Sequence, residues 1–138
     1  MDFKLENVVV PVTDVDRAKA FYADKMGFTV DVDHAPNDQF RVVQLTPSGS
    51  ACSITIGTGV STSEPGSYQG LHLVVTDVEA ARALLVERGV EAGEPYHFGP
   101  EGQAPGVDPA HRDFHSYLSV SDPDGNGWLI QEVHYQAS

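Results

Sequence analysis

The side chains that could do chemistry are one histidine in a strand-like segment and several histidines and carboxylates nearer the C-terminus. His72 lies in the alternating segment 70–75, and Glu132 lies near the end of the segment 127–133. Imidazole and carboxylate groups are common general acids and bases, and both also bind divalent metals. The chemistry that is possible therefore depends on which of these groups face the same side of the same sheet.

A duplication in the sequence positions these segments. The motif Val12-Thr13-Asp14-Val15 recurs as Val75-Thr76-Asp77-Val78, and each copy follows an alternating hydrophobic segment. Each aspartate is followed by an Ala-rich helical stretch and a glycine, Gly27 or Gly89, and Asp14 is a good N-cap for the first helix. A repeat of this length is a whole supersecondary unit. We therefore expect an α+β chain built from two tandem βαβββ modules with pseudo-two-fold symmetry.

The modules are expected at residues 1–57 and 70–138, joined by a linker at 58–69 that is rich in Gly, Ser, Thr and Pro. After each helix, alternation and turn signals predict three strands. These strands are expected at 28–32, 40–45, 51–56, 90–98, 114–120 and 127–133. A long Gly- and Pro-rich loop between residues 98 and 113 is expected to be disordered or functional.

The bulk composition excludes some classes of function. Eight Lys and Arg against 20 Asp and Glu give a net charge of −12, which disfavours nucleic-acid binding because phosphates require clustered cations. The acidic surface is either simply solvated or a field that attracts a cationic small molecule. We expect no membrane partner and no signal peptide. We expect a cytoplasmic location, since Cys52 stands alone and cannot form an intramolecular disulfide.

The two module openings and the closing hairpin together resemble one known superfamily. The segments that carry this resemblance read VVVPVTDVDRAKAFY, GLHLVVTDVEAARALL and SDPDGNGWLIQEV. They are similar to the vicinal oxygen chelate superfamily of glyoxalases, extradiol dioxygenases, epimerases, fosfomycin-resistance enzymes and bleomycin-binding proteins. The resemblance covers almost the whole chain and implies a cup-shaped, partly open mixed sheet. It also implies a homodimer, but it does not specify a reaction.

Enzymes of this superfamily usually hold a divalent metal through ligands on the first and last strand of each module. Counted from the V-x-D aspartates and from the hairpin turns, the four ligand positions fall on Asn7, Ser53, Gly70 and Leu129. Gly and Leu offer no side-chain donor, and Asn and Ser are weak neutral ligands. We therefore expect no metal ligands at these positions and no cofactor.

A relocated metal site is the alternative. It would use His72, Glu132 and a loop histidine, namely His97, His111 or His115. Strand alternation places Glu132 on the helix-packed face or exposes it near the strand end, so a β-bulge would be needed to turn it toward the cup. If this alternative holds, the expected metal is Zn, Ni, Mn or Fe.

By the same alternation, the cup is expected to carry a mixed polar and apolar lining that suits a medium-sized organic ligand. The expected ligand-binding residues are Asn7, Ser53, Thr55, His72, Tyr117, Leu129 and Gln131. Three aromatic residues flank the long loop and either stack on a planar ligand or anchor the loop: Tyr96, Phe98 and Phe114. Arg112 either binds an anionic ligand group or forms a salt bridge with Asp113 or a nearby acid.

Three functions fit these expectations. The first is a metal-free protein that sequesters a small organic ligand, such as a cationic, antibiotic-like molecule, as bleomycin-binding relatives do. The second is a glyoxalase-like lyase or isomerase, or a dioxygenase, with relocated metal ligands. The third is a metal-independent enzyme of secondary metabolism in which His72 and Tyr117 transfer protons. The first is the function that we favour.

Overall fold

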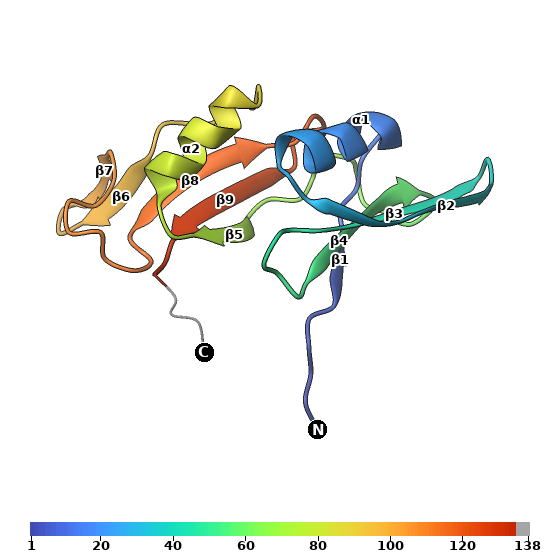
Figure 1. Cartoon of the computed structure of the whole chain (residues 1–138), viewed down its shortest axis with the longest axis horizontal. Coiled ribbons are helices and arrows are strands. Elements are labelled where there is room, and N and C mark those ends of the chain that lie inside the picture. Colours follow the sequence, from blue (N-terminus) through green and yellow to red (C-terminus); the bar gives the residue numbers. More distant parts are fainter. Residues whose placement is uncertain (135–138) are drawn as a thin grey trace. The chain divides into compact units, whose positions relative to one another are not determined.

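The computed structural model describes residues 1–134, in which the chain folds as two compact units (Figure 1). The first unit comprises Met1–Tyr68 together with Asp122–Asn126, and the second comprises Gln69–Ser121 and the chain from Gly127 onward. The second predicted module runs to residue 138, and its last four residues lie outside the described part.

The first unit is a four-stranded mixed sheet with one helix. Its strands are β1 (Asn7–Val9), β2 (Thr29–Asn37), β3 (Phe40–Thr46) and β4 (Ser53–Thr58), in the order β1-β4-β3-β2, with β1 parallel to β4. Helix α1 (Val15–Ala20) continues into a π-helical turn (Phe21–Lys25) that ends before Gly27, whose φ is +80°. The Asp14 side chain caps α1 by accepting a hydrogen bond from the backbone N–H of Arg17 at 3.0 Å.

The turn Asp122–Asn126 is held in the first unit by buried hydrogen bonds. Asp122 Oδ2 accepts from the hydroxyl of Tyr22 at 2.7 Å and from Asn126 Nδ2 at 2.8 Å. Asn126 Nδ2 also donates to the carbonyl of Pro11 at 2.8 Å. Because both Tyr22 and Asn126 are fully buried, these bonds fix the turn in the core of this unit.

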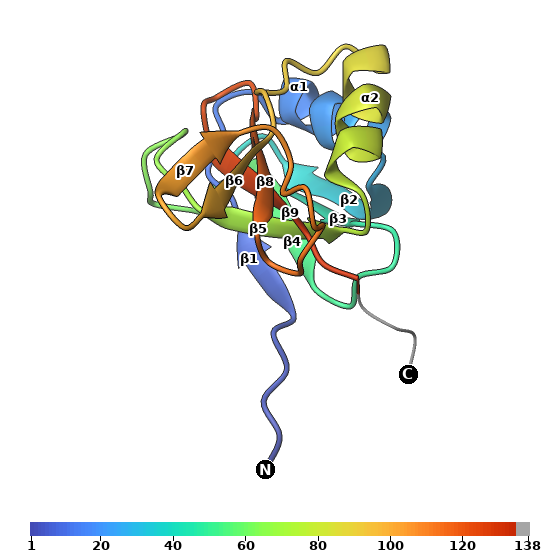
Figure 2. The same cartoon turned by 90° about the vertical axis from the view of Figure 1, so that its left-hand side faces the viewer.

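The second unit is a five-stranded mixed sheet in the order β5-β9-β8-β6-β7, with helix α2 (Val78–Glu87) packed against β8 and β9. Its strands are β5 (Leu71–Val75), β6 (Tyr96–Gly99), β7 (Gly102–Pro105), β8 (Ser116–Ser121) and β9 (Gly127–Glu132). Strand β5 runs parallel to β9, and Figure 2 shows the β6–β7 hairpin at the edge of the sheet. Asp77 caps α2 through the N–H of Ala80 at 3.0 Å, which repeats the role of Asp14.

The expected α+β architecture is confirmed, with two differences in the second unit. The strand expected at 90–98 begins only at Tyr96, because Gly93 and Pro95 interrupt the preceding segment. The segment expected to be loop contains β7, a four-residue edge strand whose Gly and Pro content resembles that of a turn. Among residues 1–134, no helix has the length and apolar character needed to cross a membrane.

Candidate functional site

Polar and aromatic side chains gather on the face of the five-stranded sheet that lies away from α2. Alternate residues of β8 and β9 are buried on the helix side: Ser116, Leu118, Val120, Trp128, Ile130 and Glu132. The residues between them, together with those of β5, form the opposite face: His72, Val74, Tyr117, Ser119, Leu129 and Gln131. The structure thus brings four of the predicted ligand-binding residues onto one face: His72, Tyr117, Leu129 and Gln131.

Three aromatic rings lie in contact at one side of this face, and we call Tyr96, Phe98 and Tyr117 the aromatic patch. The rings of Tyr96 and Tyr117 stack at 5.5 Å between centroids, with an interplanar angle of 14°. Phe98 meets Tyr96 and Tyr117 edge-on at 6.0 Å and 5.5 Å. Phe98 is 43% exposed, so the patch offers an apolar surface to a planar ligand.

Gln131 joins the aromatic patch to the long loop. Its Nε2 donates to the hydroxyl oxygen of Tyr117 at 2.9 Å and to the carbonyl of Phe114 at 3.2 Å. Since the Tyr117 oxygen accepts a hydrogen here, its own hydrogen can be donated to another group. The Gln131 Oε1 supplies an acceptor beside it, so the edge of the patch carries both kinds of hydrogen-bonding group.

His72 lies on the same face but apart from Tyr117. His72 pairs in register with Leu129, and strand β9 separates β5 from β8. Neighbouring strands are about 4.8 Å apart, so roughly 10 Å separates the two backbones. The Tyr117 hydroxyl bonds Gln131, and we expect it and His72 to act on different parts of a ligand.

The other three predicted ligand-binding residues lie in the first unit. Asn7 pairs with Ser53 in register, and Asn7 Nδ2 donates to Thr55 Oγ1 at 2.7 Å. Ser53 Oγ contacts Thr46 Oγ1 at 2.7 Å and Gln44 Nε2 at 3.3 Å. Gln44 and Thr46 were not among the predicted residues, although their alternation along β3 places them on this polar face.

The four usual ligand positions do not suit a divalent metal. Asn7 and Ser53 already make hydrogen bonds to neutral groups in the first unit. In the second unit, Gly70 and Leu129 line a pocket of about 250 Å³ but add no donor atom from a side chain. Metals of this kind require imidazole, thiolate or carboxylate ligands. Within residues 1–134, no group of three or more His, Cys, Asp or Glu side chains is placed to hold an ion.

The relocated metal set is not assembled either. The β5–β9 register runs without a bulge from Leu71–Trp128 to Val75–Glu132, so His72 and Glu132 stay on opposite faces of the sheet. His97 Nδ1 and His115 Nδ1 each contact a backbone carbonyl, at 2.7 Å and 3.2 Å. The hypothesis that a bulge turns Glu132 toward His72 is therefore wrong.

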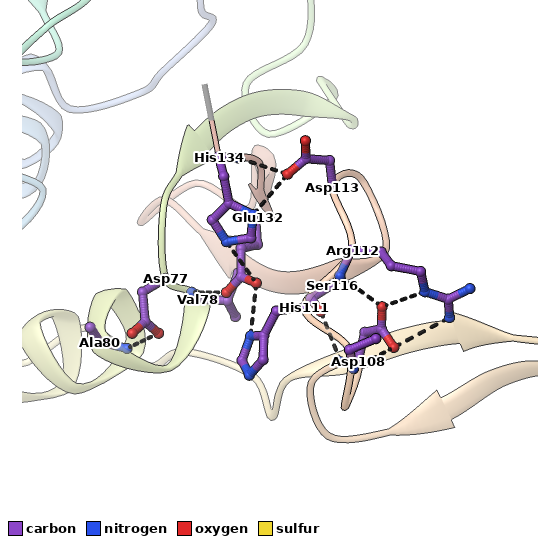
Figure 3. A network of polar contacts seen from close by, with 11 residues as sticks. Asp77, Val78, Ala80, Asp108, His111, Arg112, Asp113, Ser116, Glu132 and His134 are labelled. Atoms are coloured by element: carbon purple, nitrogen blue, oxygen red, sulfur yellow. Dashed lines mark hydrogen bonds and ion pairs between the residues drawn. The ribbon is translucent and has the colours of Figure 1, made fainter. Parts of the chain in front are cut away.

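Glu132 is instead the centre of a polar network on the helix side of the sheet (Figure 3). Its carboxylate, with 1% of the side chain exposed, accepts from the N–H of Val78 at 3.0 Å at the start of α2. It also contacts His111 Nδ1 at 3.0 Å and His134 Nε2 at 3.4 Å. The hydrogen bond and charge of Glu132 raise the pKa of His111 above its usual value.

Arg112 was expected either to bind an anionic ligand group or to form a salt bridge, and the structure shows a salt bridge. Its Nε contacts Asp108 Oδ2 at 2.8 Å, and its backbone N–H donates to the same oxygen at 2.9 Å. This guanidinium holds the pKa of the Asp108 carboxyl well below its usual range. The buried Asp108 thus organises the loop from within, and Arg112 forms its salt bridge with this nearby acid and not with Asp113.

Comparison with known proteins agrees with this architecture. The family model described as "Glyoxalase/Bleomycin resistance protein/Dioxygenase superfamily" matches residues 4–130. No curated protein gives a significant match to the sequence.

Several solved structures are similar over nearly their whole length. TnmS3, an antibiotic binding protein from Streptomyces sp. CB03234, is 31% identical with a TM-score of 0.75, covering 96% of this chain and 98% of its own. A glyoxalase/bleomycin resistance protein from the same organism is 32% identical with a TM-score of 0.71, covering 94% and 100%. A superfamily member from Sphaerobacter thermophilus DSM 20745 is 27% identical with a TM-score of 0.72, covering 95% and 98%.

Proposed function

Because this chain belongs to the glyoxalase/bleomycin resistance protein/dioxygenase superfamily, we propose that it binds and sequesters a small organic molecule without a resident metal. The observation that carries this proposal is the aromatic patch with its polar edge. Tyr96, Phe98 and Tyr117 offer ring surface, and Gln131 and the Tyr117 hydroxyl offer hydrogen bonds beside it. Such a combination of apolar surface with a few placed polar groups is typical of small-molecule sites.

The similarity to an antibiotic binding protein supports an antibiotic-like ligand. The charge distribution favours a neutral or cationic one. Within residues 1–134, at least five of the eight Lys and Arg side chains are paired with carboxylates: Arg17, Lys19, Arg41, Arg82 and Arg112. Twenty acidic residues therefore face few cations that are available to an anionic ligand, and the resulting field attracts positive charge.

A thermal-shift screen tests the proposal. We expect planar aromatic compounds, neutral or cationic, to raise the melting temperature, because a ligand that binds only the folded state stabilises it. At a concentration 100 times its Kd, such a ligand adds about 2.7 kcal/mol. Matched anionic analogues of the same ring systems serve as controls and are expected to give smaller shifts. A turnover that is lost in His72→Ala while affinity persists would favour an acid–base enzyme instead.

Metal analysis tests the metal-free part of the proposal. We expect protein purified without chelator or metal-affinity resin to contain far less than one equivalent of Zn, Ni, Mn or Fe. We also expect the ligand-induced thermal shift to be unchanged by EDTA, since the ligand would be held by side chains alone. One equivalent of metal, with ligand binding lost on chelation, would contradict the proposal.

We propose in addition that the protein is a cytoplasmic homodimer. The unpaired Cys52 fits a reducing compartment. The dimer is what the resemblance to the superfamily implies. A single light-scattering mass of about 30 kDa, twice the chain mass of 14.9 kDa, is the expected result. A mass that stays at one chain across concentrations would contradict it.

A further inference from the structure

The loop from Asp108 to His115 is fastened to the end of β9 by ionisable groups. His111 Nδ1 lies 3.0 Å from Glu132 Oε2, and the N–H of Phe114 donates to the carbonyl of Glu132 at 3.0 Å. Asp113 Oδ1 accepts from both the N–H and Nδ1 of His134 at 2.8 Å. Figure 3 shows the Glu132 carboxylate between the two histidines.

Two residues of this loop hold backbone conformations that side chains rarely adopt. The φ of His111 is +50° and that of Phe114 is +71°. Left-handed conformations cost roughly 1–2 kcal/mol for residues other than glycine, and they persist only where surrounding contacts hold them. The loop is therefore expected to relax when the contacts at His111 weaken.

The same loop forms the border of the aromatic patch. Gln131 Nε2 bridges the carbonyl of Phe114 and the hydroxyl of Tyr117. The N–H of Phe98 donates to the carbonyl of His115 at 3.2 Å, and His115 Nδ1 lies 3.2 Å from the carbonyl of Phe98. Movement of the loop would thus disturb two of the three rings through their hydrogen-bonding neighbours.

We propose that His111, Glu132, His134 and Asp113 form a proton-dependent latch, which holds the 108–115 loop against the aromatic patch and releases it as pH rises. Its consequence for a ligand, faster dissociation at alkaline pH, rests on the proposed function. The latch itself is a property of the protein without ligand.

The direction of this pH dependence follows from the charged groups that face His111. Glu132 faces it from β9, and the acidic side chains of Asp77 and Glu79 act on it from the start of α2. All three are negative and favour the imidazolium, with Glu132 contributing most. The pKa of His111 in the folded state is therefore above its usual value. The ion pair is fully formed below the unfolded value and is lost as pH rises through the raised one.

On the other side of Glu132, the latch contains His134 and Asp113. The backbone N–H and the ring of His134 lower the pKa of Asp113, so Asp113 stays ionised throughout the neutral and alkaline range. The backbone N–H of His134 does not titrate, so its hydrogen bond to Asp113 persists while the His111 contact weakens. The latch is therefore expected to open from the His111 side, where the backbone is strained.

Hydrogen exchange of the ligand-free full chain tests the latch. After normalisation to intrinsic exchange rates, we expect protection of the Phe114 N–H to fall about threefold to tenfold between pH 6 and pH 8.5, as expected for loss of a part-exposed ion pair. In His111→Gln, which cannot titrate, protection is expected to be low and independent of pH. His34→Gln in β2 is the matched control and is expected to behave like the wild type.

Two results would overturn the latch: wild-type protection that does not change with pH, or a His111→Gln variant that keeps the wild-type pH dependence. If circular dichroism shows that His111→Gln does not fold, His111→Asn replaces it, because asparagine tolerates positive φ and does not titrate. No ligand is needed for these measurements. A failed ligand screen would therefore reject the proposed function without deciding the latch.

Discussion

Glu132→Ala is expected to lower the free energy of unfolding of the second unit by about 2–4 kcal/mol. The Glu132 side chain is 1% exposed and accepts hydrogen bonds from the start of α2 and from the loop. Its removal leaves the Val78 N–H buried without its acceptor and leaves a cavity behind the sheet. Urea unfolding followed by the fluorescence of Trp128, the single tryptophan, which is buried in β9, measures the change.

Two further variants show how much of this effect comes from the charge of Glu132 and how much from its burial. Glu132→Gln keeps an oxygen for the Val78 N–H but removes the charge that faces His111, so an intermediate loss of about 1–2 kcal/mol is expected. Glu94→Ala removes a carboxylate that is 84% exposed and paired with Arg82, and it is expected to cost less than about 1 kcal/mol. A Glu132→Ala protein as stable as Glu94→Ala would show that the buried carboxylate does not stabilise this unit.

The role of Glu132 also shows where sequence reasoning succeeds and where it ends. Strand alternation correctly assigned Trp128 and Ile130 to the helix side of β9, because the period of a strand is a local property. For Glu132 it left two alternatives, the helix-packed face or exposure near the strand end, and the structure shows the first. The partners of Glu132 were not predictable in this way. His111 and Val78 are far from Glu132 in sequence, and their contact depends on how a loop and a helix end pack together.

The aspartates of the repeat allow a second comparison between what was predicted from the sequence and what the structure shows. Asp14 was predicted to cap its helix and does so, because capping involves residues three positions apart. Asp77, its counterpart in the repeat, caps α2 in the same way. The turn beginning at Asp122 was also predicted from its own residues. Its hydrogen bonds to Tyr22 and Pro11, which place it in the first unit, join segments about a hundred residues apart and leave no local signal.

The aromatic patch was predicted only in part. Sequence alternation selected Tyr117, while Tyr96 and Phe98 were left with two roles, stacking on a ligand or anchoring the loop. In the structure the three rings form one surface, and Phe98 also bonds the loop through its backbone. Phe98 therefore anchors the loop through its backbone, while its ring belongs to the surface that we propose binds the ligand. The surface is a result of the β6–β8 pairing of Tyr96 with Tyr117.

Tyr117→Ala is expected to weaken ligand binding about 30-fold or more, the largest effect on affinity of any single change on this face. Tyr117 stacks on Tyr96, meets Phe98 edge-on and accepts a hydrogen bond from Gln131. Aromatic residues that anchor a binding site typically contribute 2 kcal/mol or more when truncated, and about 1.4 kcal/mol corresponds to a tenfold change in affinity. Isothermal titration with the best compound from the thermal-shift screen measures the effect.

Tyr117→Phe distinguishes ring contact from hydrogen bonding. It keeps the stacked ring but removes the hydroxyl that meets Gln131, so a loss of about threefold to tenfold is expected. Phe40→Ala, which removes a 39% exposed ring from β3 in the first unit, is the control and is expected to leave affinity unchanged. If Tyr117→Ala folds and binds as tightly as the control, the ligand does not bind at the aromatic patch. If Tyr117→Phe is as weak as Tyr117→Ala, the hydroxyl and Gln131 recognise the ligand, and the rings serve to position them.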